Sequence, residues 1–263
     1  VQRRQDRSGH TVRLAAIYSV GLHHLNQYVD QFRAVAPGAD VDLEYMHPDG
    51  ICERVLNDQT DLGLMSFVTP GRELTAIPWH RQLMVVACSP THRFARLAAR
   101  QGGVRPTDLV DEQFVAFARE LPVRREVDRF LRRHDVEVNV AAEFDNIETI
   151  KQAVDEGAGI AVLPEPTLQR EVQRRTLVQA RFILPQGEPQ LVRPLSIVHR
   201  RNRRLNPTVK AFITLLQNGK ASAPTQPVHS RTTSGPRPLA GEGRTSEGAR
   251  TRPSTNATGE ATL

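Results

Sequence analysis

Apolar residues in the first third of the chain alternate between strand-like runs and a helical repeat. Val12–Ile17 and Val41–Met46 are rich in apolar residues and have the length of strands. Between them, residues 22–35 carry apolar side chains at helical spacing, namely Leu22, Leu25, Val29 and Phe32. A short helix at Ile51–Leu56 and a third strand at Leu62–Ser66 continue the alternation. Strands that alternate with helices in this way predict an α/β fold.

The segment Glu143–Pro164 contains a strand end, a capped helix and a buried strand. Asn146 is placed to cap the helix by accepting a hydrogen bond from the backbone N–H of Thr149. The apolar face of this helix consists of Ile147, Ile150 and Val154. Gly157 then ends the helix, and Ile160–Leu163 follows as a short apolar strand. Because the helix start has free N–H groups and a positive dipole end, the segment predicts a cradle for carboxylate, phosphate or sulfate.

A similar strand and turn occur near the start of the chain. Val12–Ile17 leads into the turn Tyr18–Gly21, and the predicted helix of residues 22–35 follows. Ser19 has the place of a helix-capping or ligand-contacting hydroxyl group. Two such strand-to-helix turns on one chain predict two facing lobes.

The order and spacing of several segments resemble the effector-binding region of LysR-type transcriptional regulators. The resemblance covers roughly residues 11 to 217. It rests on the first strand with Ser19 at its exit, Phe32–Pro37, Asp61–Leu64, Leu83–His92 and Glu143–Pro164. The resemblance implies an α/β, two-lobe fold of the periplasmic-binding-protein type (type II), in which mixed five-stranded sheets are flanked by helices. An inducer would bind in the cleft between the lobes.

The resemblance also implies how the chain is divided. The expected parts are a linker remnant (1–10), lobe I (11–87 and 195–217), lobe II (88–194) and a disordered tail (218–263). The chain would cross between the lobes near Val86–Ser89 and Pro194–Val198, and a last helix at Pro207–Leu216 would pack on lobe I. From Ala221 onward the chain has no aromatic residue and repeats Pro, Gly, Ser and Thr, which is typical of disorder.

By the same resemblance, the ligand is held where strands end at the cleft. The matching positions in lobe I are Ser19, Val20, Gly21, Met46, His47, Ser66, Phe67 and Val68. Those in lobe II are Phe117, Arg119, Asn146 and Ile147. Arg119 is the cation expected to pair with an anionic effector, while Ser19 and Asn146 are also explained as plain helix caps. The expected ligand is a small polar or anionic metabolite, and no cofactor or metal is expected.

One part of the family's pattern is absent from this chain. Members begin with a winged helix-turn-helix and a linker helix, whereas here Val1–Gly9 alone precedes the first strand. Since the chain also lacks an initiating Met, we expect a fragment or processed form that reaches DNA only through a missing domain. A second copy is the expected protein partner, in a homodimer or tetramer formed through the helices at Leu22–Val35 and Leu121–His134.

The net charge of +6 lies mainly at the two ends of the chain. Residues 1–7 carry +2 and residues 220–263 carry +3, which leaves +1 for residues 8–219. This distribution argues only weakly for a DNA-binding face on the folded part. Arginine clusters such as Arg124-Arg125 are expected to lie on solvated helix faces.

The candidate nucleophiles do not form a recognisable active site, so we expect no enzyme. Ser19 and Ser66 lack the Gly-x-Ser-x-Gly elbow, and Cys52 and Cys88 lack partners at metal-ligand spacing. An enzyme of the porphobilinogen-deaminase or transferase type on the same fold is one alternative, because Cys88 lies at the expected crossing between the lobes.

Two thiols, the absence of a signal-peptide region at the start, and no apolar run near the roughly 20 residues that span a bilayer predict a cytoplasmic location. A solute-binding protein of the same two-lobe fold is the other alternative function. The arginine-rich start without a secretion signal argues against it.

Overall fold

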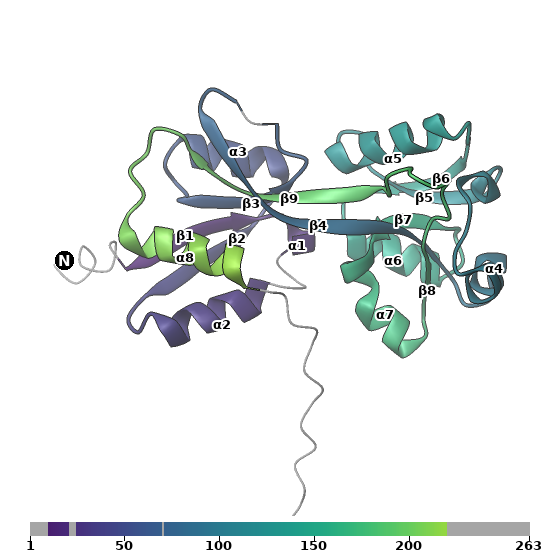
Figure 1. The fold of residues 1–263 in the computed structure, drawn as a ribbon, viewed down its shortest axis with the longest axis horizontal. Helices are drawn as coiled ribbons and strands as arrows, with labels where there is room; N and C mark the ends of the chain where they lie inside the picture. The colour runs from purple at the N-terminus through teal and green to yellow at the C-terminus, as the bar shows by residue number, and fades with distance from the viewer. Residues whose placement is uncertain (1–9, 21–24, 70, 220–263) are drawn as a thin grey trace, which may run out of the picture. The chain divides into compact units, whose positions relative to one another are not determined.

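The computed structural model describes residues 10–20, 25–69 and 71–219, in which strands alternate with helices (Figure 1). The strands are β1 (Thr11–Ala16), β2 (Asp40–Tyr45), β3 (Leu62–Ser66), β4 (Leu74–Cys88), β5 (Gln113–Phe117), β6 (Asn139–Phe144), β7 (Ala161–Pro164), β8 (Val178–Ala180) and β9 (Val192–Arg200). The α-helices are α1 (Tyr18–Val20), α2 (Asn26–Val35), α3 (Pro48–Leu56), α4 (Arg93–Gln101), α5 (Pro122–Arg133), α6 (Ile147–Asp155), α7 (Gln169–Arg174) and α8 (Pro207–Asn218). Two 3-10 helices cover Pro106–Leu109 and Glu165–Leu168. The expected linker remnant up to residue 9, Gly21, and the expected tail from residue 220 lie outside the described residues.

Most of the described strands belong to one sheet, with the order β2-β1-β3-β9-β4-β7 and β8 paired to β4. β1 is parallel to β2 and β3, whereas β9 is antiparallel to β3 and β4. β4 pairs with β9 over Leu74–Leu83 and with β7 over Met84–Ala87. β5 and β6 form a parallel pair, which a bridge between Phe114 and Ile160 links to the start of β7. Each lobe is therefore built on five of the described strands, and β4 serves both lobes (Figure 1).

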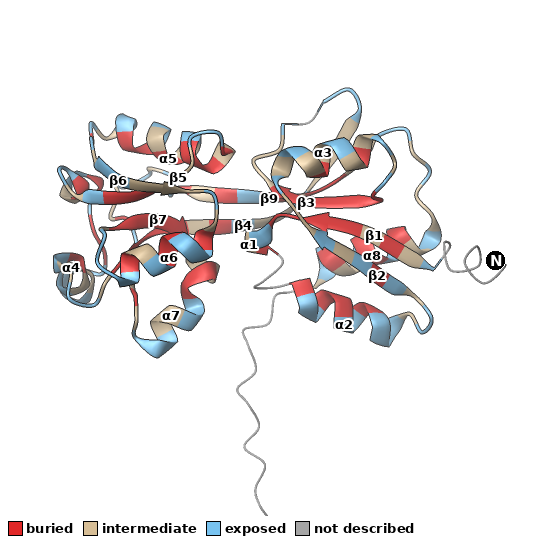
Figure 2. Ribbon diagram, turned by 180° about the vertical axis from the view of Figure 1, so that it is seen from behind, coloured by how far each residue is buried: buried red, intermediate tan, exposed pale blue. Residues whose placement is uncertain are grey.

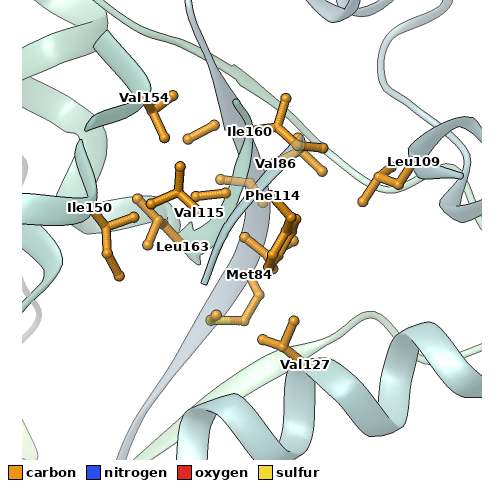
Figure 3. Close-up of a cluster of buried hydrophobic side chains, with 14 of the residues drawn as sticks. Met84, Val86, Leu109, Phe114, Val115, Val127, Ile150, Val154, Ile160 and Leu163 are labelled. Carbon is orange, nitrogen blue, oxygen red and sulfur yellow. The ribbon is translucent and has the colours of Figure 1, made fainter. Parts of the chain in front are cut away.

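Two separate clusters of buried apolar side chains form the core. One draws on residues 12–65 and 195–216, and the other on residues 84–191. Figure 2 shows buried positions on the strands and on one side of the helices that cover them. In the second cluster, side chains from β4, β5, β7, α5 and α6 converge (Figure 3). This separation supports the division into lobes I and II, whose boundaries stay a prediction.

The predicted alternation of strands and helices is confirmed, with differences at the ends of elements. β3 has the predicted bounds Leu62–Ser66. The helix expected at Leu22–Val35 begins at Asn26 among the described residues. The first half of β4 was outside the sequence prediction, because Pro78–Arg81 interrupts its apolar pattern. None of the described helices combines the length and apolar character that a membrane crossing requires.

Gly63 in β3 allows α3 and β9 to approach the same strand closely. A Cβ atom at this position would lie 2.4 Å from Ile51 Cγ2 of α3 and 2.6 Å from Val198 Cγ2 of β9. Both neighbouring side chains are fully buried, so neither can move aside without disturbing the core. The missing side chain is therefore a packing requirement of lobe I.

We expect Gly63→Ala to lower the free energy of unfolding by about 2 kcal/mol, because an added methyl overpacks the core. Urea denaturation followed by circular dichroism measures this change. Gly71→Ala is the matched control, since a Cβ there has no neighbour within 4 Å. A loss of stability in the control as large as in Gly63→Ala would contradict the packing explanation.

Candidate functional site

A cavity of about 450 Å³ lies between elements of the two core clusters. It is lined by Ile17, Tyr18, Ser19, Met46, His47, Pro48, Ser66, Phe117, Leu121, Pro122, Val123, Asp145, Asn146, Ile147 and Arg193. Most of these residues end or follow the parallel strands β1, β2, β3, β5 and β6, or begin α5 and α6. Crevices at the carboxyl ends of parallel strands are the usual ligand sites of α/β folds.

Arg193 of β9 brings a buried positive charge to the cavity. Its side chain is 2% exposed, and Gln82 is its register partner on β4. The Arg193 Nε and Nη2 atoms donate to Gln82 Oε1 at 2.9 and 2.5 Å, and Nη1 donates to Ser19 Oγ at 2.8 Å. Among the described residues, no carboxylate forms an ion pair with this guanidinium. Its hydrogen bonds are therefore made to neutral groups, which leave its charge unbalanced.

Burial lowers the pKa of Arg193 to about 9, because the charged guanidinium has left water without gaining a counter-ion. It remains protonated at neutral pH. Of the five N–H groups of an arginine, Gln82 and Ser19 engage three, so two are left for another acceptor. A buried, unpaired cation in a cavity is costly unless an anion joins it. The cavity thus contains a buried positive charge that has no counter-ion among the described residues.

The expected site residues of lobe I divide into those that line the cavity and those that do not. Ser19, Met46, His47 and Ser66 line it. The others expected there were Val20, Gly21, Phe67 and Val68. Val20 is fully buried in the lobe I core, and Phe67 and Val68 pack against the two core clusters. Gly21 lies outside the described residues.

In lobe II, the expected residues Phe117, Asn146 and Ile147 line the cavity. The Asn146 side chain caps α6, but it accepts from the N–H of Glu148 at 2.8 Å and not from that of Thr149 as the sequence predicted. The difference is one position within the first turn, where both N–H groups lack a partner in the helix.

Arg119, the cation expected to meet an effector, lies outside the cavity lining. Its side chain is 79% exposed and donates to Glu143 at 3.0 Å. Glu143 also accepts from Arg124, whose guanidinium donates to the carbonyl of Phe117 at 2.6 Å and to Asp128. Arg124 is buried, so the expectation of a solvated Arg124-Arg125 cluster was wrong for Arg124. It ties the end of β5 to α5 and to β6, which carry the lobe II wall.

Sequence reasoning missed Arg193 and the start of α5, where Leu121, Pro122 and Val123 line the cavity. A signal for Arg193 was present, since it is the lone charged residue in the apolar run 191–198. Arginine is seldom fully buried without a partner, so a cation inside a buried strand is a candidate for a functional position.

The described residues offer little for catalysis. They contain no group of three or more His, Cys, Asp or Glu side chains that could hold a metal ion. Burial, assisted by the charge of Glu112, raises the pKa of the Cys88 thiol to about 11. A thiol with that pKa is almost entirely protonated at neutral pH, so Cys88 is a poor nucleophile. This argues against the cysteine-based enzyme.

The comparisons with known proteins agree with this arrangement. The LysR substrate binding domain model matches residues 5–221. The chain belongs to the LysR substrate-binding domain family. The uncharacterized HTH-type transcriptional regulator YeiE of Escherichia coli (strain K12) is 26% identical over 202 residues, which are 77% of this chain and 66% of YeiE. This LysR substrate-binding chain thus spans about two thirds of the length of YeiE.

Solved structures of the family have the same fold as this LysR substrate-binding domain. The regulatory domain of Synechocystis PCC6803 CcmR in complex with 2-PG has a TM-score of 0.68 and 26% identity, covering 79% of this chain and 95% of that one. The effector binding domain of QuiR in complex with shikimate has a TM-score of 0.68 and 18% identity, covering 80% and 96%. The expected two-lobe fold of the periplasmic-binding-protein type is confirmed.

We expect Gln82→Met alone to lower the free energy of unfolding of this LysR substrate-binding domain by about 2 kcal/mol, because it leaves the buried guanidinium short of acceptors. Replacing both partners, as in Gln82→Met with Arg193→Met, is expected to restore most of that loss, since no charge is then stranded. A double-mutant cycle measured by urea denaturation tests this. A double variant less stable than Gln82→Met would rule out the account.

Proposed function

We propose that this chain is the effector-binding domain of a DNA-binding transcriptional regulator and that it binds a small polar or anionic metabolite in the cavity. The observation that carries the proposal is the buried Arg193, which faces the cavity without a carboxylate partner among the described residues. Ser19, Ser66 and Asn146 add polar groups to the same lining. The relatives support the proposal, because YeiE is named a regulator and the CcmR and QuiR domains were solved with small molecules.

Binding would control transcription by favouring one arrangement of the two lobes over another. A ligand shifts such an equilibrium only if its affinity for the two arrangements differs. Arg193 and Ser19 lie on β9 and α1, whereas Phe117 and Asn146 belong to lobe II elements. A ligand held by both sets has different contacts whenever the lobes change their separation, which gives the required difference in affinity.

The proposed regulator contacts DNA through a helix-turn-helix domain. It acts in the cytoplasm, where the DNA is. A second copy of the domain is the proposed protein partner, in a homodimer or tetramer formed through α2 and α5. A solute-binding role is not favoured, because the family match is to regulators.

Thermal unfolding of the protein with a panel of sulfate, amino acids, aromatic and dicarboxylic acids, sugars and sugar phosphates tests the function. A ligand at 100 times its Kd adds about 2.7 kcal/mol and raises the Tm by several degrees. We expect anions to give the shifts and Arg193→Met to abolish them. Ser19→Ala with Asn146→Ala should also remove them, at a cost of about 2 kcal/mol in stability, because the double variant loses an acceptor of Arg193 and the cap of α6.

The matched control for this panel is Arg81→Met. Arg81 is exposed and neighbours Gln82 on β4, so its loss removes a nearby cation without touching the cavity lining. The control should keep every shift seen with the unchanged protein. Shifts that survive Arg193→Met and the Ser19 and Asn146 double variant would refute the site.

A further inference from the structure

We infer that the metabolite of this cavity is an organic monoanion, with one carboxylate or a group of similar size and charge on an apolar body. The inference rests on the proposed function and narrows its ligand class. It follows from three properties of the lining, which are the number of charges, the donors left free and the apolar wall of lobe II.

The charges of the lining balance a single negative group. Arg193 and Asp145 are the charged residues of the lining, beside His47, which is neutral unless protonated. Asp145 is exposed, so water screens its charge, whereas Arg193 is buried and its charge is felt strongly. A monoanion neutralises the buried cation. Among the described lining residues, a second negative charge on the ligand would meet no further arginine or lysine, and it would approach Asp145.

The free donors also match a carboxylate. Arg193 has two N–H groups that Gln82 and Ser19 do not engage, and two donors on one guanidinium suit the two oxygens of a carboxylate. The start of α6 has one of its N–H groups engaged by its own side-chain cap. Asn146 already accepts from the N–H of Glu148, so the side-chain cap of this helix is internal.

The lobe II side of the lining is mostly apolar. Beside Asp145 and Asn146, this side consists of Phe117, Leu121, Pro122, Val123 and Ile147, and all five but Pro122 are buried. Arg124 fixes it by holding the Phe117 carbonyl and, through Glu143, the end of β6. A ligand whose charge meets Arg193 therefore places its remainder against hydrocarbon. Burial of an apolar body there adds about 25 cal/mol per Å² of surface removed from water.

Matched ligand trios test the inference by calorimetry and ligand-observed NMR on the full chain. Each trio holds the body constant and compares a monocarboxylate, its neutral amide and a dicarboxylate: hexanoate, hexanamide and adipate; benzoate, benzamide and phthalate; and the cyclohexane equivalents. Inorganic phosphate is measured beside them. In at least one trio the monocarboxylate should bind about tenfold more tightly than both relatives, a difference of about 1.4 kcal/mol.

Gln82→Glu is the sharpest variant for this test. It keeps the size of the residue and retains Arg193, but it gives the guanidinium an internal carboxylate. We expect Gln82→Glu to lose the preference for the monocarboxylate without losing stability. Arg193→Met should lose the same preference, because it removes the cation. Arg81→Met should keep the preference. If Gln82→Glu binds the monocarboxylate as tightly as the unchanged protein, the unpaired charge does not select the ligand.

The remaining outcomes separate this inference from the proposed function. Equal or tighter binding of a dicarboxylate or phosphate, lost in Arg193→Met, would overturn the monoanion but keep an anion-sensing domain. Equal binding of the amides would overturn the role of the charge. Failure of all three monocarboxylates at millimolar concentration would also overturn the ligand class, whereas the proposed function falls only if the wider metabolite panel gives no shift that depends on Arg193.

Discussion

The buried guanidinium of Arg193 sets the condition that the rest of the cavity has to meet. A charge taken out of water needs partners, and here Gln82 and Ser19 supply hydrogen bonds but no countercharge. A carboxylate in place of Gln82 would form an internal ion pair with the guanidinium, and no unbalanced charge would then be left for an anionic ligand. The amide holds the guanidinium in a fixed orientation and leaves its charge for a ligand. Under the proposed function, this residue, which is unfavourable for the fold by itself, is the source of selectivity for an anion.

The position of this cation within the fold is as important as its charge. Gln82 and Arg193 are register partners on β4 and β9. After the next residue of β4, Leu83, the pairing partner of β4 changes from β9 to β7. The cation therefore lies on the strands that connect the two lobes, and its hydrogen bond to Ser19 links it to the segment that follows β1. The walls of the cavity come from the two lobes, while its charge belongs to the connection between them. Under the proposed function, a bound anion would contact the strands that join the lobes, and it would shift the arrangement of the lobes by as much as its affinity for the two arrangements differs.

Much of the fold could be predicted because most of its strands and helices have a recognisable local sequence pattern. The strand Leu62–Ser66 is an uninterrupted run, and the helix after Asn146 combines a cap, an apolar face and a glycine stop within a dozen residues. The N-terminal half of β4 could not be predicted in this way. Its residues Pro78–Arg81 include a proline, a histidine and an arginine, and only the pairing with β9, more than a hundred residues later, makes them a strand. Local pattern identifies elements, whereas long-range pairing decides where an irregular strand begins.

The same distinction explains why the sequence pointed to Arg119 and not to Arg193. Arg119 follows a strand that ends at the cleft, so its position along the chain resembles that of a ligand-binding residue. Its actual partner, Glu143, lies 24 residues away, on the strand beside it. The contact that defines Arg193 joins residues 174 positions apart. Whether an arginine is balanced depends on which carboxylates the fold brings near it, and that property belongs to the folded chain alone. What the sequence does contain is the anomaly itself, a single cation inside an apolar strand, and an unexplained charge at a buried position is a better guide to a binding site than a charged residue at a convenient turn.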